Sequence, residues 1–184
     1  MNEIGKDVSS LEDSNKKSEW LDWLKAIIIA VMIALFLKTF VFTTSIVEGE
    51  SMEPVLEDGE RVIFNKMIYM IGEPKRGDIV FIQRPAKNYV KRIIGLPKET
   101  LEIYQGELYI NGEKHPQAYL NEEAKQLTGN VGPITIPDNS YFVMGDNRAI
   151  SKDSRNGLGL VNENEIVGRS EIIIYPLSEI DRTK

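Results

Sequence analysis

A serine and a lysine in this chain stand in surroundings that suit a hydrolytic pair. Ser51 lies in the turn-like run VEGESMEP, residues 47–54, soon after the only long apolar segment. Lys91 follows forty residues later, inside the apolar run 89–94, which has the pattern of a half-buried strand. A neutral lysine amine can take the proton of a serine hydroxyl while that serine attacks a carbonyl carbon.

Such a pair works only if the lysine loses its charge. At a pKa of about 10.4, only about 4 in 10,000 lysine amines are neutral at pH 7. Burial disfavours the ammonium form, and a pKa of about 8 would raise the neutral fraction about 200-fold at a cost of about 3 kcal/mol. The apolar neighbours of Lys91 indicate burial of this kind. The single histidine, His115, lies in the turn-like run 112–116 and is expected to be a surface residue.

The composition argues against several other chemistries. The 184 residues include no cysteine, which excludes disulfides, thiolate nucleophiles and cysteine-ligated metal. With one histidine, a histidine-rich metal site or a Ser-His-Asp triad has little support, so we expect no metal and no cofactor. The net charge of -6 argues against a nucleic-acid partner, which would require a basic face.

Residues 23–42 are apolar and long enough to cross a bilayer as a helix. About 20 residues give roughly 30 Å of helix, the thickness of the hydrocarbon core. Trp20 and Trp23 suit the membrane interface. A buried core helix and a cleaved secretory signal are the alternatives. The run 26–37 has no polar face, which disfavours the first, and the preceding region is long and acidic, which disfavours the second.

The charges around this apolar segment predict its orientation. Four lysines stand before it or at its start, at positions 6, 16, 17 and 25, whereas only Arg61 follows within the next 20 residues. The positive-inside rule then places residues 1–22 in the cytoplasm, as a polar and flexible tail, and residues 43–184 outside.

Residues 43–184 read as a mainly antiparallel β domain. Short β-rich runs recur between turn residues, at 61–64, 78–82, 89–94, 140–144 and 172–175. Gln105-Gly106 and Asn111-Gly112 predict tight turns on either side of a strand at 107–110. Residues 121–128 are expected to form one or two helical turns.

A third group of charged residues lies in the run MGDNRAISKDSR, residues 144–155. Two aspartates and two arginines within ten residues can pair with one another in a rigid loop. The alternative is a solvated turn.

Four segments occur in a fixed order behind the apolar span: GESMEP at 49–54, RGDIV at 76–80, YVKRIIGLP at 89–97 and GDNRAISKDSR at 145–155. Together they resemble the bacterial type I signal peptidases, in particular the short, single-span kind of Gram-positive bacteria. The resemblance implies a membrane-bound serine endopeptidase with an antiparallel β-sheet catalytic domain, the Ser-Lys protease fold. Its partners would be exported preproteins and the lipid bilayer, with small residues preferred one and three positions before the cleaved bond.

The resemblance also implies roles for single residues. Ser51 matches the nucleophile, Lys91 the general base and Ser151 the serine that holds the lysine amine. Gly49 stands where some members have a serine that helps to form the oxyanion hole, so the hole here would depend on backbone N–H groups, chiefly that of Ser51. Met52 and its neighbours are expected to form an apolar surface against lipid. Four charged residues match positions tied to the geometry or stability of the site: Arg92, Asp146, Asp153 and Arg155.

Two other interpretations remain open at this stage. A self-cleaving repressor uses Ser-Lys chemistry, but it would need a DNA-binding helix-turn-helix where this chain has an apolar span. A membrane-tethered β module that only binds would leave Ser51 and Lys91 with structural roles.

Overall fold

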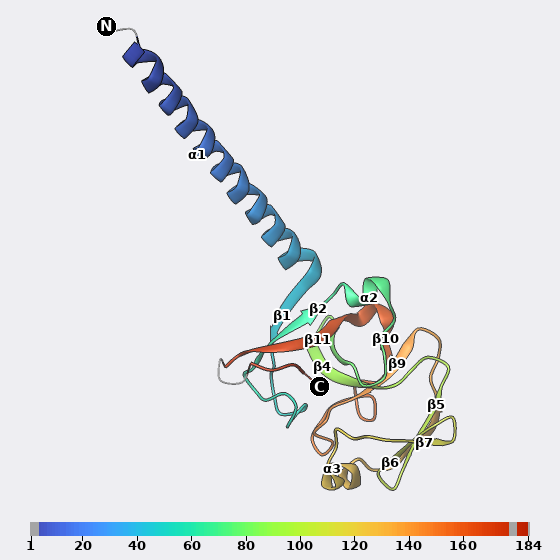
Figure 1. The fold of residues 1–184 in the computed structure, drawn as a ribbon. Coiled ribbons are helices and arrows are strands. Elements are labelled where there is room, and N and C mark those ends of the chain that lie inside the picture. Colours follow the sequence, from blue (N-terminus) through green and yellow to red (C-terminus); the bar gives the residue numbers. More distant parts are fainter. Residues whose placement is uncertain (1–3, 177–179, 184) are drawn as a thin grey trace. The chain divides into compact units, whose positions relative to one another are not determined.

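A computed structural model describes residues 4–176 and 180–183, with side chains from Trp20 onward. The chain divides into two compact units, Met1–Val41 and Phe42–Lys184. The first unit is helical and the second is built from β-strands (Figure 1).

The first unit is one long helix, α1 (Ile4–Phe36), that ends in a π-helical turn, η1 (Leu37–Val41). Residues Trp20–Val41 are long and apolar enough to cross a membrane, and none of the most apolar stretch is buried within the protein. A helix suits this environment because all its backbone hydrogen bonds are internal. The predicted range is 23–42. The span begins three residues earlier, at Trp20, and ends one residue earlier, at Val41, since Phe42 already belongs to a strand.

The prediction of a flexible segment over residues 1–22 is wrong from Ile4 onward, because α1 runs back through it. Extending an existing helix adds one hydrogen bond for each residue that is fixed, whereas starting a new helix is costly. A stable apolar helix can therefore propagate into a polar flank.

The second unit contains a large antiparallel sheet in the order β1-β2-β11-β3-β4-β9-β10. The first strand follows the span directly, and the last long strand, β11, lies in the middle of the sheet, between β2 and β3. The strands are β1 (Phe42–Ile46), β2 (Arg61–Asn65), β3 (Ile79–Gln83), β4 (Asn88–Gly95), β9 (Ser140–Met144), β10 (Val161–Asn162) and β11 (Ile166–Tyr175).

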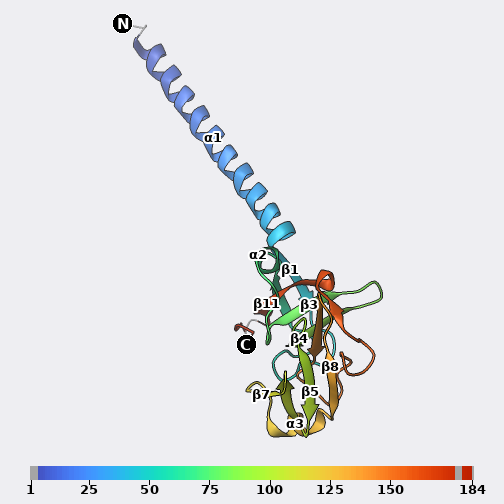
Figure 2. The same ribbon diagram turned by 90° about the vertical axis from the view of Figure 1, so that its right-hand side faces the viewer.

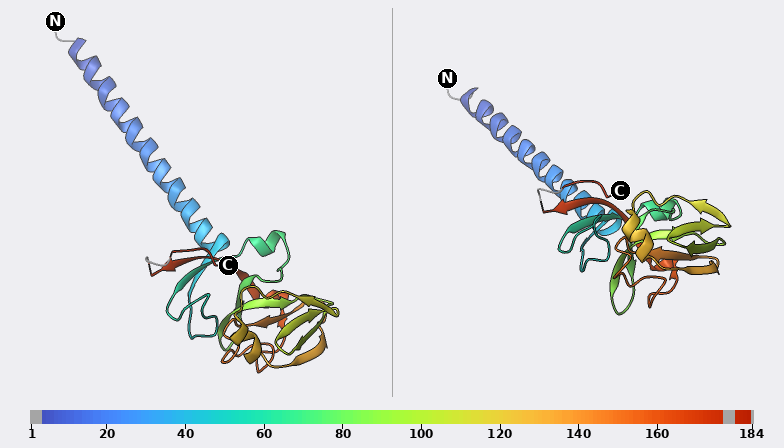
Figure 3. Two further views of the ribbon diagram at one scale, coloured as in Figure 1. Left: turned by 60° about the horizontal axis from the view of Figure 1, so that its bottom comes forward. Right: turned by 90° about the horizontal axis from the view of Figure 1, so that it is seen from below.

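A smaller antiparallel sheet has the order β7-β6-β5-β8. Its strands are β5 (Thr100–Tyr104), β6 (Glu107–Ile110), β7 (Glu113–His115) and β8 (Val131–Thr135). Both predicted turns are confirmed: Gln105-Gly106 and Asn111-Gly112 have positive φ angles and connect β5 to β6 and β6 to β7. With helix α3 (Glu122–Leu127), this sheet gathers on one side of the β unit (Figure 3).

His115 differs from its predicted place in a surface turn. It is the half-buried last residue of β7 and pairs with Leu108 of β6. The Asn111-Gly112 turn sends the chain straight back along β6, so the segment after the turn continues the sheet.

The predicted strands and the short helix at 121–128 are confirmed, and their ends differ by at most one residue in all but one case. The strand predicted at 172–175 begins six residues earlier, at Ile166. The Asn121 side chain caps α3 by accepting a hydrogen bond from the backbone N–H of Ala124. Two further helical turns, α2 (Ile68–Ile71) and η2 (Glu163–Glu165), complete the unit.

The two sheets pack on a shared apolar core. Its members from the large sheet include Ile94 and Phe142, and those from the small sheet include Leu101 and Ile103, all at most 1% exposed. A fully buried side chain of this size contributes about 1.5–3 kcal/mol relative to an exposed one. The buried C-terminal half of β4 packs in this core. The core therefore holds in place the strand that carries Lys91.

Candidate active site

The loop after β1 holds Ser51 in a fixed place. Met52 and Leu56 are fully buried beneath it, and the Val47 N–H donates to the carbonyl of Glu60 to close its base. Burial of Met52 in the core contradicts the expectation that it forms an apolar surface against lipid. The loop turns at Ser51, directly before the buried Met52. The Ser51 side chain is therefore left facing the groove described below.

Gly49 supports this loop through its backbone. Its φ of +86° lies in the left-handed region that glycine adopts readily, and its N–H donates to Asp58 Oδ1 at 2.6 Å. A Cβ at this position would meet no atom within 4 Å, so the glycine is required by its backbone angle and not by crowding. Among the described residues, no acceptor engages the backbone N–H of Ser51, the group expected to serve an oxyanion.

Lys91 lies in β4, opposite Val80 of β3, and only 3% of it is exposed. Its Nζ is 2.6 Å from Ser51 Oγ and 3.0 Å from the carbonyl oxygen of Val90, and donates to both as an ammonium. Once neutral, the amine has a lone pair that can accept the Ser51 hydroxyl proton over the same short distance. The two residues that the sequence proposed as a pair are therefore in contact.

Burial lowers the pKa of Lys91 to about 8, and this effect is larger than the opposing influence of Asp153 and Asp146. At pH 7 a pKa near 8 leaves roughly a tenth of the amine neutral, against about 4 in 10,000 for a free lysine. The same shift means that folding at neutral pH includes about 3 kcal/mol of unfavourable work to bury the ammonium.

The loop at residues 145–155 packs directly on Ser51. The backbone N–H of Asn147 donates to the Ser51 carbonyl oxygen at 3.2 Å. A Cβ on Gly145 would lie 2.2 Å from that oxygen and 2.3 Å from Ser151 Oγ, so only glycine fits there. This contact sets how closely the loop approaches Ser51.

Two buried ion pairs make the loop rigid. Arg92, adjacent to Lys91 in β4, donates Nε and Nη2 to the two carboxylate oxygens of Asp146 at 2.8 and 2.6 Å. Arg155 forms the same bidentate pair with Asp153, donating Nε and Nη2 to the two carboxylate oxygens at 2.9 and 2.8 Å. Asp153 also accepts from the Gly145 N–H at 3.1 Å. The charged run is therefore an internally paired, buried loop and not a solvated turn.

These hydrogen bonds decide the ionisation of Asp153. Burial alone would raise the pKa of its carboxyl group, but the hydrogen bonds and positive charge of Arg155, helped by the Gly145 N–H, hold the pKa below its usual value. Asp153 is consequently a carboxylate throughout the range in which Lys91 titrates.

Ser151 is fully buried beside Gly145. Its Oγ makes no hydrogen bond of good geometry with any described residue, and the two partners of Lys91 Nζ are Ser51 and Val90. Leaving a buried hydroxyl unpaired costs roughly 1–3 kcal/mol. The structure thus brings Ser151 next to the pair without the predicted hydrogen bond to the amine.

Two contributors to the site, Tyr119 and Thr128, carried no signal in the sequence. The Tyr119 ring lies under the guanidinium of Arg92, with Cζ 4.3 Å from the ring centroid. Arg148 donates to the Tyr119 hydroxyl at 3.3 Å and to Thr128 Oγ1 at 3.2 Å. Tyr119 precedes α3 in the chain and Thr128 follows it. The segment around this helix therefore supports the loop at residues 145–155 through its contacts with Arg92 and Arg148.

A groove of about 790 Å³ contains both members of the pair. It is lined on one side by the loop that follows β1 and on the other by the turn between β3 and β4. Its lining residues include Ile46, Gly49, Ser51, Tyr89, Lys91 and Ile150. No group of three or more metal-ligating side chains occurs in the part of the chain that the structure describes.

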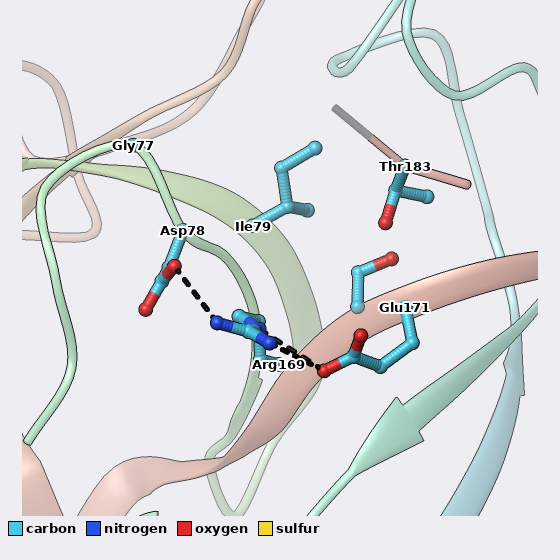
Figure 4. A pocket seen from close by; sticks show the side chains of 7 residues that line it. Gly77, Asp78, Ile79, Arg169, Glu171 and Thr183 are labelled. Carbon is cyan, nitrogen blue, oxygen red and sulfur yellow. Dashed lines mark hydrogen bonds and ion pairs between the residues drawn. The ribbon is translucent and has the colours of Figure 1, made fainter. Parts of the chain in front are cut away.

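A second, smaller cavity of about 220 Å³ lies between the start of β3 and the middle of β11 (Figure 4). Arg169 spans it, with Nη2 2.8 Å from Glu171 Oε1 and Nη1 3.7 Å from Asp78 Oδ1. It holds neither Ser51 nor Lys91. The larger groove is therefore the candidate substrate site.

A membrane-anchored β protein with a serine hydroxyl against a buried lysine defines a class: the Ser-Lys hydrolases. Comparison with known proteins narrows this class. The family model for signal peptidase, peptidase S26, matches residues 20–175. The chain therefore belongs to the signal peptidase family, and its activity is that of signal peptidase I, a serine endopeptidase that cleaves signal peptides.

Curated relatives agree along almost the whole chain. Signal peptidase I of Bacillus licheniformis is 48% identical over 94% of this chain and 97% of that protein. Signal peptidase I S of Bacillus subtilis is 48% identical over 94% and 98%. Signal peptidase IB of Staphylococcus aureus is 38% identical over 89% and 93%. A solved signal peptidase I from Enterococcus faecalis is 33% identical, with a TM-score of 0.48, over 53% of this chain and 97% of that one.

We predict that Gly145→Ala lowers the cleavage rate by roughly 100-fold or more, because a misplacement of about 1 Å near the reacting atoms has that effect. The added methyl would collide with the Ser51 carbonyl oxygen, a backbone atom that cannot simply rotate away. Cleavage of a preprotein by purified variants, with the fold checked by circular dichroism, measures this. The matched control is Ala149→Ser, an exposed position in the same loop. Wild-type rates for folded Gly145→Ala would contradict the proposed packing.

Lys91→Met should be inactive yet more stable by about 1 kcal/mol at pH 7, since it removes about 3 kcal/mol of unfavourable charge burial but loses two hydrogen bonds of about 1 kcal/mol each. The unfolded chain binds the lysine proton up to about pH 10.5, whereas the folded protein releases it near pH 8. The wild type therefore gains stability between pH 8 and 10.5, and the advantage of the variant shrinks across that window. Denaturant unfolding at pH 7 and pH 10 measures the difference. An equal gap at both values would show that Lys91 is not destabilised by burial.

Proposed function

We propose that Ser51 is the nucleophile and Lys91 the general base with which this peptidase cleaves signal peptides from exported preproteins. The observation that carries the proposal is the 2.6 Å contact between Lys91 Nζ and Ser51 Oγ, made by a lysine that is 3% exposed. A charged lysine on the surface would offer no lone pair, whereas burial makes the neutral amine accessible near neutral pH.

The reaction follows from this contact in two stages. Neutral Lys91 takes the hydroxyl proton while Ser51 Oγ attacks the carbonyl carbon of the scissile bond, and the resulting ammonium gives that proton to the departing amine. The acyl ester on Ser51 is then hydrolysed by a water molecule, which Lys91 activates in the same way. The backbone N–H of Ser51 is proposed to stabilise the oxyanion, and Gly49 supplies the backbone angle that the adjacent turn requires.

The remaining predicted residues serve as scaffold in this proposal. Two buried, bidentate ion pairs hold the loop at residues 145–155 against Ser51: Arg92 with Asp146, and Arg155 with Asp153. Ser151 is proposed to orient the Lys91 amine during turnover. The support for this role is an unpaired, fully buried hydroxyl beside the reacting residues.

We also propose the division of the chain across the membrane. Residues 1–22 lie in the cytoplasm, the apolar span crosses the bilayer, and the β unit faces outward. This orientation is supported by the excess of lysine before the span. A signal peptide has its apolar segment in the bilayer, so its cleavage site emerges on the face where the β unit is held.

The function is tested with a purified preprotein that carries alanine one and three positions before the cleavage site. Wild type should release the mature fragment, whereas Ser51→Ala and Lys91→Arg should release none. Arginine keeps the positive charge but stays protonated at any working pH, so it separates charge from basicity. Lys87→Arg, at an exposed position of the same groove, is the matched control and should be active. Product from Lys91→Arg at the wild-type rate would remove Lys91 from the role of base.

The pH dependence of kcat/KM gives a second prediction. Because the active form is the neutral amine, activity should rise with pH through an apparent pKa of about 8 and fall at lower pH. If Ser151 orients that amine, Ser151→Ala should lower the rate by about 5- to 150-fold, the effect of roughly 1–3 kcal/mol. Ser151→Thr keeps the hydroxyl and should retain more activity. Full activity and an unchanged pH profile in Ser151→Ala would make this serine part of the loop only.

The orientation is tested by adding protease to intact protoplasts. The β unit should be digested, while an epitope placed before Trp20 stays protected until the membrane is opened. The reverse pattern of protection would contradict the outward placement of Ser51.

A further inference from the structure

The turn between β3 and β4 forms one wall of the groove and has few contacts of its own. β3 ends at Gln83, β4 begins at Asn88, and the groove is lined by every residue from 86 to 91. Residues 85–88 are all exposed. The green hairpin that carries them extends to one side of the β unit (Figure 2). A wall this bare must be held in place from its base.

The large sheet does not hold the tip of this hairpin. β11 pairs with β3 only as far as Ile82, and β9 pairs with β4 only from Arg92 onward. Gln83 and Asn88 therefore pair with each other and with no other strand of the described chain. Because two strands without a further neighbour are at best marginally stable, the tip depends on side-chain contacts.

Arg84, the first residue after β3, supplies these contacts. Its Nε and Nη2 donate to the two carboxylate oxygens of Glu165 at 2.8 and 3.1 Å. Its Nη1 donates to the carbonyl oxygen of Leu158 at 2.5 Å, and its Nη2 donates to that of Leu160 at 2.9 Å. The planar guanidinium has five N–H donors in a rigid fork, which a lysine cannot replace. One side chain thus ties the turn both to η2 and to the segment that follows the loop at 145–155.

The reacting pair is held by other contacts. β4 is buried from Lys91 to its end, whereas Asn88 is exposed and the next two residues are only half-buried. Arg92 fixes the strand to Asp146 through its buried ion pair. Loss of the Arg84 contacts should therefore release the wall and leave Lys91 in place.

We propose that Arg84 is a positioning residue for the substrate, because it holds the β3–β4 turn as a wall of the groove. Arg84 does not line the groove itself, so it acts through residues 86–90 and does not touch the substrate. The inference rests on the proposed function, in which this groove binds the segment that is cleaved. It concerns substrate binding and not the chemical step.

The kinetic test compares purified full-length variants in detergent on one preprotein. Arg84→Gln should raise KM about 10-fold and change kcat less than 2-fold, since a wall that is in place for a tenth of the time weakens apparent binding by that factor. Arg84→Lys keeps the charge without the fork, so its KM should lie between. The matched control Arg169→Gln removes a similarly buried pair, with Glu171, outside the groove. It should keep the wild-type KM.

A second measurement reports on the wall without catalysis. The chain has no cysteine, so Ala86→Cys gives a single site for a nitroxide spin label. Its electron paramagnetic resonance spectrum should sharpen, which shows faster motion, when Arg84→Gln is added. The spectrum should stay unchanged when Arg169→Gln is added.

An unchanged KM in folded Arg84→Gln would overturn the proposal, and so would equal spectra with and without that change. A loss confined to kcat would also overturn it and show that Arg84 serves the loop at 145–155. Should Arg84→Gln fail to fold, Arg84→Lys carries both tests with a smaller rise in KM. The spectrum requires no cleavage and KM is compared with the wild type, so a failure of the Ser51-Lys91 mechanism would leave both readouts intact.

Discussion

The burial of the Lys91 amine is the constraint on which the other features of the site depend, because an ammonium in this position is both chemically useless and energetically unfavourable. Burial lowers its pKa to about 8, which makes the base available at the cost of about 3 kcal/mol of folding free energy. The protein offsets that cost with the apolar core that β4 shares between the two sheets. A single strand thus carries the Lys91 amine near its middle and is held by packing of its C-terminal half.

The second requirement is that Ser51 reach the amine at hydrogen-bonding distance, and this comes from a backbone contact. The loop at 145–155 donates an N–H to the Ser51 carbonyl and approaches so closely at Gly145 that no side chain fits. Arg92 links this loop to β4 through Asp146, and the Tyr119 ring lies beneath it. Buried ion pairs of this kind are weak evidence for stability, since desolvation opposes the attraction. Here they are better understood as devices that hold a loop in one position.

The sequence alone could predict that Ser51 and Lys91 lie together, because local patterns around each residue combine with four ordered segments that resemble a known family. Ser51 stands in a turn soon after an apolar span, and the residues around Lys91 have the apolar pattern of a buried strand. Contacts between distant segments left no such signal. Tyr119, in the segment between β7 and α3, lies against Arg92 of β4, and the pairing of His115 with Leu108 depends on the exact register after Asn111-Gly112. Met52 could not be assigned to the core from its polar neighbours, and β1 was hidden because Thr43, Thr44 and Ser45 separate its two apolar end residues.

The ionisation of one amine therefore tests the account most directly. Lysines of the full-length protein in detergent are labelled with carbon-13 at the ε position, and the resonance that disappears in Lys91→Met is assigned to Lys91. Its chemical shift is then followed by NMR from pH 6 to pH 11 in a Ser51→Ala background, where no turnover interferes. The account predicts a midpoint of about 8 for Lys91, well below the reference value of about 10.4 at which exposed lysines titrate. A midpoint near 10.4 would show that the amine keeps its proton at neutral pH, and Lys91 could not then be the base.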